Sequence, residues 1–127
     1  MMPTMSARLQ RLPSPLTVAA CVVAILTLTA CAGTQRPADQ ITSPGEALFN
    51  GRIRPDINCY TCHDGDGAGT LRGPNLGKRV PKLTDQEIAQ AIADGPGLMP
   101  SFKDKISDAE VKEITGWLRT RFPKLAQ

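Results

Sequence analysis

Three stretches of the chain combine a helix-start pattern with apolar residues at helical spacing. In each, a Ser or Thr is followed three residues later by Glu, which is the spacing of a capping box. These patterns occupy residues 43–46, 84–87 and 107–110. The apolar positions that follow, and the Gly and Pro residues beyond them, predict helices over residues 44–50, 85–94 and 108–122.

The first and last predicted helices each contain a glycine at an interior position. Gly45 and Gly116 lower helix stability relative to Ala, so we expect the two helices to cross closely there. The apolar residues of the last helix recur at helical spacing: Val111, Ile114, Trp117, Leu118 and Phe122. No stretch alternates apolar and polar residues as a half-buried strand would. The fold class is therefore predicted to be all-α, a small domain of three or more helices.

Composition limits how such a domain can be stabilised. The chain has 127 residues, enough for one domain, but it contains only 1 Trp, 1 Tyr and 3 Phe. Eleven Gly and eleven Pro residues predict many loops. We therefore expect another apolar group to fill part of the core. The formal charge of +3 is a small excess of base without clustering, so no nucleic-acid partner is predicted.

The N-terminal region has the pattern of an export signal. Arg8 and Arg11 precede an apolar run over residues 16–30, which is shorter than the roughly 20 residues of a membrane-spanning helix. The run ends in Leu-Thr-Ala-Cys, which resembles the lipobox of bacterial lipoproteins, whose Cys becomes the acylated first residue. We predict a lipoprotein signal peptide over residues 1–30 and lipidation of Cys31. The alternative is an ordinary signal cut near Ala32.

Cleavage before Cys31 would leave 97 residues with a side-chain charge of +1. Residues 32–42 are mostly polar and could reach roughly 36 Å when extended, so residues 31–43 are predicted to be the acylated Cys and a flexible tether. The folded domain is predicted over residues 44–127. The protein would be exported and lipid-anchored to a bacterial membrane, with the domain facing the periplasm or the cell exterior.

Two cysteines of the predicted domain lie in a haem-attachment pattern. Residues 59–63 read Cys-Tyr-Thr-Cys-His, and the C-x-x-C-H spacing is the signature of covalently bound c-type haem. Cys59 and Cys62 would each bond one haem vinyl group, and His63 would present its imidazole to the iron. The alternatives are a zinc site, which needs four ligands, a thioredoxin-like redox pair, which needs a βαβ setting, and a plain disulfide. We predict one haem c with its iron as the cofactor.

The second iron ligand is predicted by elimination. The 97-residue chain has one His, which the motif uses, and one Met, Met99. A Met/His pair raises the reduction potential of haem iron. Met99 lies among Gly and Pro residues that predict an extended loop, 36 positions after His63. The alternative is that Met99 only fills the core.

Over residues 43–122 the sequence resembles the monohaem class I cytochromes c. The matching residues are Gly45, Phe49, the 59–63 motif, Gly73, Pro74, Asn75, Leu76, Met99, Pro100, Phe102 and Trp117. The resemblance implies that the Pro74 carbonyl accepts a hydrogen bond from His63 Nδ1, and that Leu76 and Phe102 also bind the haem. The spacing from Phe49 to Cys59 departs from the family, so residues 50–57 resemble an inserted loop. Candidates for holding the haem propionates are Arg72, Asn75, Lys78 and Arg79.

These observations predict a membrane-anchored carrier that moves one electron at a time between larger respiratory or periplasmic redox proteins. No catalytic residues and no small-molecule substrate are expected. One alternative is a haem-based ligand sensor or a small peroxidase-like enzyme with a labile Met ligand. Another is a fixed cytochrome subunit of a larger oxidoreductase complex.

Overall fold

The computed structural model describes residues 32–125, which form helices, turns and loops without any strand. The α-helices are α2 (Pro44–Phe49), α3 (Tyr60–His63), α4 (Asp85–Asp94) and α5 (Asp108–Arg121), and three short 3-10 helices are η2 (Ala38–Gln40), η3 (Leu76–Lys78) and η4 (Val80–Lys82). The all-α prediction is confirmed for this part of the chain. No helix among these residues is long and apolar enough to cross a membrane. The predicted signal peptide over residues 1–30 and Cys31 lie outside the described residues.

Two of the three predicted helix starts are complete capping boxes. The Thr84 hydroxyl accepts a hydrogen bond from the Glu87 amide at 3.1 Å, and the Glu87 carboxylate accepts one from the Thr84 amide at 2.7 Å. Ser107 and Glu110 repeat this arrangement at the start of α5. At α2 the Ser43 hydroxyl caps the helix alone. These local bonds explain why the sequence pattern located the helices to within about one residue.

The close crossing of the first and last helices is confirmed at Gly45. A Cβ atom on Gly45 would lie 2.0 Å from the carbonyl oxygen of Glu113, so α2 and α5 approach as closely as their backbones allow. The rings of Phe49 and Trp117 pack beside this contact at a tilt of 45°, with centroids 4.7 Å apart. The same prediction is wrong for Gly116, because a Cβ atom there would have no neighbour within 4 Å. Gly116 lies on a different face of α5.

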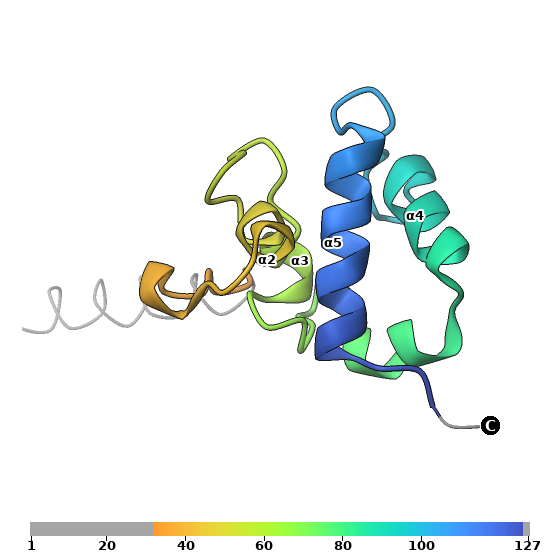
Figure 1. The fold of residues 1–127 in the computed structure, drawn as a ribbon, viewed down its shortest axis with the longest axis horizontal. Coiled ribbons are helices and arrows are strands. Elements are labelled where there is room, and N and C mark those ends of the chain that lie inside the picture. The colour runs from red at the N-terminus through yellow and green to blue at the C-terminus, as the bar shows by residue number, and fades with distance from the viewer. Residues whose placement is uncertain (1–31, 126–127) are drawn as a thin grey trace, which may run out of the picture. The chain divides into compact units, whose positions relative to one another are not determined.

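Helix α4 packs against α5 on the side away from α2, as Figure 1 shows. Ile88 and Ile92 are its buried side chains. Arg119 of α5 joins the two elements, because its guanidinium donates to the Val80 carbonyl at 2.7 Å, to the Leu83 carbonyl and to the Asp85 carboxylate at 2.6 Å. The α5 helix thus lies at the centre of the domain, between α2 and α4.

The predicted insertion over residues 50–57 joins the core at its two ends, and residues 52, 53, 55 and 56 between them are exposed. Asn50 and Ile57, its first and last residues, are both 0% exposed. The Arg52 amide donates to the Ala47 carbonyl at 2.8 Å, and the Ile57 amide donates to the Arg54 carbonyl at 2.9 Å. The loop therefore turns back onto α2 and adds Ile57 to the apolar cluster.

The segment predicted to be a flexible tether differs from that expectation at residues 33–36. The Gly33 amide donates to the Thr61 carbonyl at 2.9 Å, and the Gly65 amide donates to the Thr34 carbonyl at 2.8 Å. These bonds join the segment to α3 and to the loop after it. The polar composition of the segment predicted a flexible tether because it offers little apolar surface to bury. Backbone hydrogen bonds can nevertheless hold such a segment against the domain. The ordered domain thus extends upstream of residue 44.

Candidate functional site

The predicted haem-attachment motif forms one helical turn and a sharp exit. Cys59 precedes α3, and its carbonyl accepts a hydrogen bond from the His63 amide at 3.0 Å. Asp64 then ends the helix with φ 62°, and it is the one described residue other than glycine in the left-handed region. A single turn places the side chains of positions 59, 62 and 63 close together along α3. The local fold therefore brings the two thiols and the imidazole to one short element.

The imidazole of His63 is held in one orientation. Its side chain is buried, and its Nδ1 lies 3.0 Å from the Pro74 carbonyl oxygen. A carbonyl can only accept, so Nδ1 carries the proton and Nε2 is left with a free lone pair. This is the tautomer that a metal-binding histidine uses, with the second nitrogen oriented by a backbone carbonyl.

The sulfur atoms of Cys59 and Cys62 are not joined in a disulfide. Burial raises the pKa of the Cys59 thiol to about 12, so this sulfur is protonated at neutral pH. A redox-active thiol pair needs a cysteine whose pKa is lowered to favour the thiolate. A raised pKa at Cys59 and the absence of strands among the described residues do not fit a thioredoxin-like pair, which needs a lowered pKa and a βαβ setting.

The loop after α3 returns along the helix and fixes it from the side of Cys62. The Cys62 carbonyl accepts a hydrogen bond from the Thr70 hydroxyl at 2.7 Å. A Cβ atom on Gly73 would lie only 2.8 Å from that same carbonyl oxygen. The Gly-Pro pair therefore has two functions: the first residue lets the loop approach Cys62, and Pro74 then reaches His63.

Met99 lies on a loop that is bound to the end of α4. This loop leaves α4 at Gly95, whose φ is 67°, and the Ser101 hydroxyl returns to the Ala93 carbonyl at 2.6 Å. The Met99 side chain is partly buried and packs against the apolar core cluster, as Leu76 and Cys59 do. Phe102 is a buried member of that cluster. The structure therefore places these four predicted site residues around one apolar core, and confirms that residues 95–100 are not helical.

Comparison with known proteins agrees with this arrangement. Residues 42–118 match the family described as cytochrome c oxidase, cbb3-type, subunit III. The chain belongs to this family and is a monohaem c-type cytochrome. No solved structure matches the chain at a significant level.

Several curated cytochromes are similar to this one. The cytochrome bc1 complex cytochrome c subunit of Corynebacterium diphtheriae is 35% identical over 88 residues, which cover 66% of this chain and 28% of the relative. Cytochrome c6 of Chlamydomonas reinhardtii is 28% identical over 111 residues, covering 83% of this chain and 70% of the relative. Cytochrome c6 of Synechocystis is 31% identical over 83 residues, covering 58% and 60%. The cytochrome thus spans about a quarter of the length of the bc1 subunits that it matches.

The residues present fit the haem c of this family. Cys59 and Cys62 supply the two thiols for covalent attachment of one haem. A haem contributes apolar surface to a core in which the described residues bury three aromatic side chains, those of Phe49, Phe102 and Trp117. His63 offers Nε2 beside them. Within residues 32–125 no three His, Cys, Asp or Glu side chains are grouped as metal ligands, so the zinc alternative finds no four-ligand site there.

The four residues predicted to hold the haem propionates differ in the contacts that they make in the structure. The side-chain oxygen of Asn75 accepts a hydrogen bond from the Lys78 amide at 3.3 Å and so caps η3. Arg72, Lys78 and Arg79 are exposed. Among the described residues nothing brings these four side chains to one point, and their role stays a prediction.

Sequence reasoning missed Asn50, whose hydrogen bonds hold together the segments around α3. Its side chain is completely buried, donates to the Glu46 carbonyl at 3.2 Å and to the Gly65 carbonyl at 3.1 Å, and accepts from the Arg36 amide at 2.8 Å. Asn50 therefore connects α2, residues 33–36 and the loop just after His63. A lone Asn at the end of a helix is common, so the sequence held no signal for this role.

Proposed function

We propose that this cytochrome is a membrane-anchored carrier of single electrons in which His63 Nε2 and the Met99 sulfur are the axial ligands of the haem iron. The observation that carries the proposal is the 3.0 Å contact between His63 Nδ1 and the Pro74 carbonyl. This bond orients the ring and increases the donor strength of Nε2. The haem supplies a centre that accepts and releases one electron, and the chain's residues hold it in a fixed environment.

Met99 is the candidate for the opposite ligand because the sequence offers few others. The chain contains one His and, beyond residue 5, one Met. The Met99 amide donates to the Pro96 carbonyl at 3.2 Å, which keeps this side chain on a short turn beside the core. A thioether opposite an imidazole favours ferrous iron and raises the reduction potential. The apolar side chains of Leu76 and Phe102 would contact the haem.

Electron transfer is favoured over catalysis by the absence of reacting groups around the proposed ligands. The described residues contain no second His and no cysteine outside the attachment motif. The relatives are named cytochrome c6 and cytochrome bc1 complex cytochrome c subunit. We infer that the partners are larger respiratory or periplasmic redox proteins, and that neither a small-molecule substrate nor nucleic acid is bound.

The proposed membrane anchor depends on the sequence before the domain. The apolar run over residues 16–30 and the Leu-Thr-Ala-Cys sequence that ends it support export and acylation of Cys31. A single acyl chain binds a membrane only marginally, so stable anchoring requires more than one chain. We place the acylated protein on a bacterial membrane, with its haem domain in the periplasm or at the cell exterior.

A second candidate is a fixed subunit of a larger oxidoreductase complex. The family description names an oxidase subunit, and three relatives are named as subunits of a bc1 complex. The chemistry at the haem would be the same in both cases. Purification from membranes in mild detergent separates the two candidates, because a fixed subunit stays with its complex and a carrier elutes alone.

Replacement of Met99 tests the ligand assignment and the sensor or peroxidase alternative together. The reduced wild-type protein should not change its Soret band when carbon monoxide is added, because both axial positions are filled. Met99→Ala should bind carbon monoxide, lose the weak near-infrared sulfur-to-iron band of the ferric form and have a lower reduction potential. Leu98→Ala is the matched control, because Leu98 is adjacent and 98% exposed. Carbon monoxide binding by the wild type would contradict the carrier function, and an unchanged Met99→Ala spectrum would exclude Met99 as a ligand.

A further inference from the structure

Residues 33–36, which we call the strap, lie against the helix that carries the haem-binding cysteines. The Gly33 amide donates to the Thr61 carbonyl at 2.9 Å. A Cβ atom on Gly33 would lie 1.8 Å from the Tyr60 carbonyl oxygen and 2.9 Å from the Asp64 Cα atom. Any side chain at position 33 would therefore force the strap away from α3. Only glycine at position 33 allows the strap to lie this close to α3.

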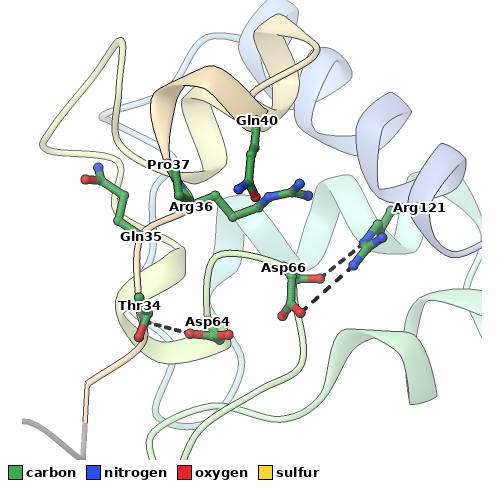
Figure 2. A pocket seen from close by; sticks show the side chains of 8 residues that line it. All are labelled: Thr34, Gln35, Arg36, Pro37, Gln40, Asp64, Asp66 and Arg121. Atoms are coloured by element: carbon green, nitrogen blue, oxygen red, sulfur yellow. Dashed lines mark hydrogen bonds and ion pairs between the residues drawn. The ribbon is translucent and has the colours of Figure 1, made fainter.

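The next residue of the strap binds the chain immediately after His63. The Thr34 amide donates to the Asp64 carboxylate at 2.6 Å, and the Thr34 carbonyl accepts from the Gly65 amide at 2.8 Å. Figure 2 shows Thr34 and Asp64 side by side among the residues that line a pocket. Thr34 is thus hydrogen-bonded through both its amide and its carbonyl to the two residues that follow α3.

Arg36 fastens the other end of the strap to α2. Its guanidinium lies 2.8 Å from the Glu46 carboxylate, and the Glu46 side chain is only 2% exposed. Its amide donates to the buried Asn50 side chain at 2.8 Å, and its carbonyl accepts from the Arg52 guanidinium. Detaching the strap would leave the buried Glu46 charge without its cation. The strap is therefore a fixed part of the domain and not a mobile linker.

We propose that the strap holds the acylated N-terminus beside α3, so that the domain docks on the lipid bilayer with the face formed by residues 33–36 and α3. This inference rests on the proposed acylation of Cys31. Two backbone steps separate Cys31 from Gly33, so their Cα atoms lie at most about 8 Å apart. A free tether over residues 31–43 would instead let the domain move up to roughly 40 Å from the membrane.

Docking by this face fixes the height of the haem above the bilayer. A haem bonded to Cys59 and Cys62 would be attached to α3 and to the residue before it, and the strap contacts the same helix through Tyr60 and Thr61. The lipid surface and the haem would therefore be separated by about the thickness of one helix with its side chains, roughly 10 Å. Partners would have to present their redox centres close to the membrane surface.

Energy transfer from a lipid fluorophore to the haem measures this height. The processed holoprotein is incorporated into vesicles of phosphatidylethanolamine and phosphatidylglycerol that contain a headgroup-labelled fluorescent lipid, and quenching by the haem is recorded. A second protein carries twelve Gly and Ser residues inserted between Ala32 and Gly33, which leaves the strap and the residue after Cys31 unchanged. The insertion adds about 20 Å of average reach, so we expect it to lose roughly half or more of the quenching.

Hydrogen exchange tests the strap separately from the lipid. In the wild-type holoprotein the amides of Gly33, Thr34 and Gly65 should exchange slowly. Gly33→Leu should make all three exchange faster and should reduce the quenching in vesicles as the insertion does. Gly116→Ala is the matched control, because that position has open space around it, and it should leave both measurements unchanged.

Mass spectrometry of the mature protein separates failure of this proposal from failure of the anchor. A mature protein without acyl chains on Cys31 would overturn both. An acylated protein whose quenching is unchanged by the insertion would overturn the docking geometry and leave the anchor intact. Fast exchange of Gly33 and Thr34 in the wild type would overturn the strap itself.

Discussion

Two regions of the cytochrome, the crossing of α2 with α5 and the haem-binding segment over residues 58–79, are held together by different interactions. In the crossing, large apolar side chains are buried against each other, among them Phe49, Ile114 and Trp117. Gly45 lets the two backbones meet. This region is a small conventional core, in which side-chain packing supplies the stability.

The haem-binding segment contributes no apolar side chain to the fully buried core between Ile57 and Val80. It is ordered by hydrogen bonds of the backbone, such as Gly69 to the His63 carbonyl at 2.8 Å and Leu76 to the Gly67 carbonyl at 2.9 Å. Hydrogen bonds add little net stability when water is the alternative partner. The crossing is therefore packed by large side chains of its own, whereas residues 58–79 place only partly buried apolar side chains, those of Cys59, Tyr60 and Leu76, against the core.

Removal of the haem attachment should have the largest effect. We expect the double variant Cys59→Ala, Cys62→Ala to lose most of the helical circular dichroism signal, because the remaining apolar residues are too few to hold the helices. The comparison predicts that residues 58–79 lose their amide protection first. Leu71→Ala, in the same segment at an 88% exposed position, is the control and should remain folded. A native-like spectrum of the haem-free variant would show that the segment needs no haem.

Adding one methyl group at the helix crossing should have the second largest effect. Gly45→Ala places a Cβ atom 2.0 Å from the Glu113 carbonyl oxygen, so the helices must separate, and we expect a loss of about 3 kcal/mol in the free energy of unfolding. Gly116→Ala is the same change in open space and should stabilise the protein by about 0.5–1 kcal/mol. Chemical denaturation of both holoproteins measures the difference. Equal effects would mean that the crossing is not closely packed.

The smallest effect concerns the pH dependence of the helix starts. Hydrogen bonds from the Thr84 and Ser107 amides lower the pKa of Glu87 and Glu110. A pKa lowered by folding means that these carboxylates stabilise the protein above their unfolded pKa of about 4.5, and that the contribution is lost as the pH falls through the folded value. The difference in unfolding free energy between wild type and Glu87→Gln should therefore shrink from about pH 6 to about pH 3. Gln90→Ala, an exposed position of the same helix without a titratable group, is the control and should show no such trend.

The parts of the structure that were predicted from sequence are those with local causes. A capping box is complete within four residues, so Thr84 and Ser107 located α4 and α5. The attachment motif also lies within one turn, and it predicted α3's two thiols and imidazole, although not that these residues form a helix. The contact of Pro74 with His63 was expected from the family resemblance, and its distance is now observed.

The parts that sequence reasoning missed depend on polar contacts between distant segments. Arg36 and Glu46 pair across ten positions, and Asn50 bonds Gly65 fifteen positions away. Apolar periodicity contains no information about such bonds, so the strap was predicted to be a tether. At Gly116 the sequence predicted a close contact that the structure does not have. A glycine on an open helix face cannot be distinguished in the sequence from a glycine that a helix crossing requires.

The binding of the Met99 loop to α4 bears on the speed of electron transfer. Gly95 leaves no room for a side chain, since a Cβ atom there would lie within 2.6 Å of Met99 and Pro100 backbone atoms. The amides of Phe102 and Lys103 both donate to the Ala93 carbonyl, at 3.2 Å and 3.1 Å. A sulfur ligand carried on this loop would stay in place when the charge on the iron changes. The protein would then need little nuclear rearrangement in each oxidation or reduction, which keeps the barrier to electron exchange low.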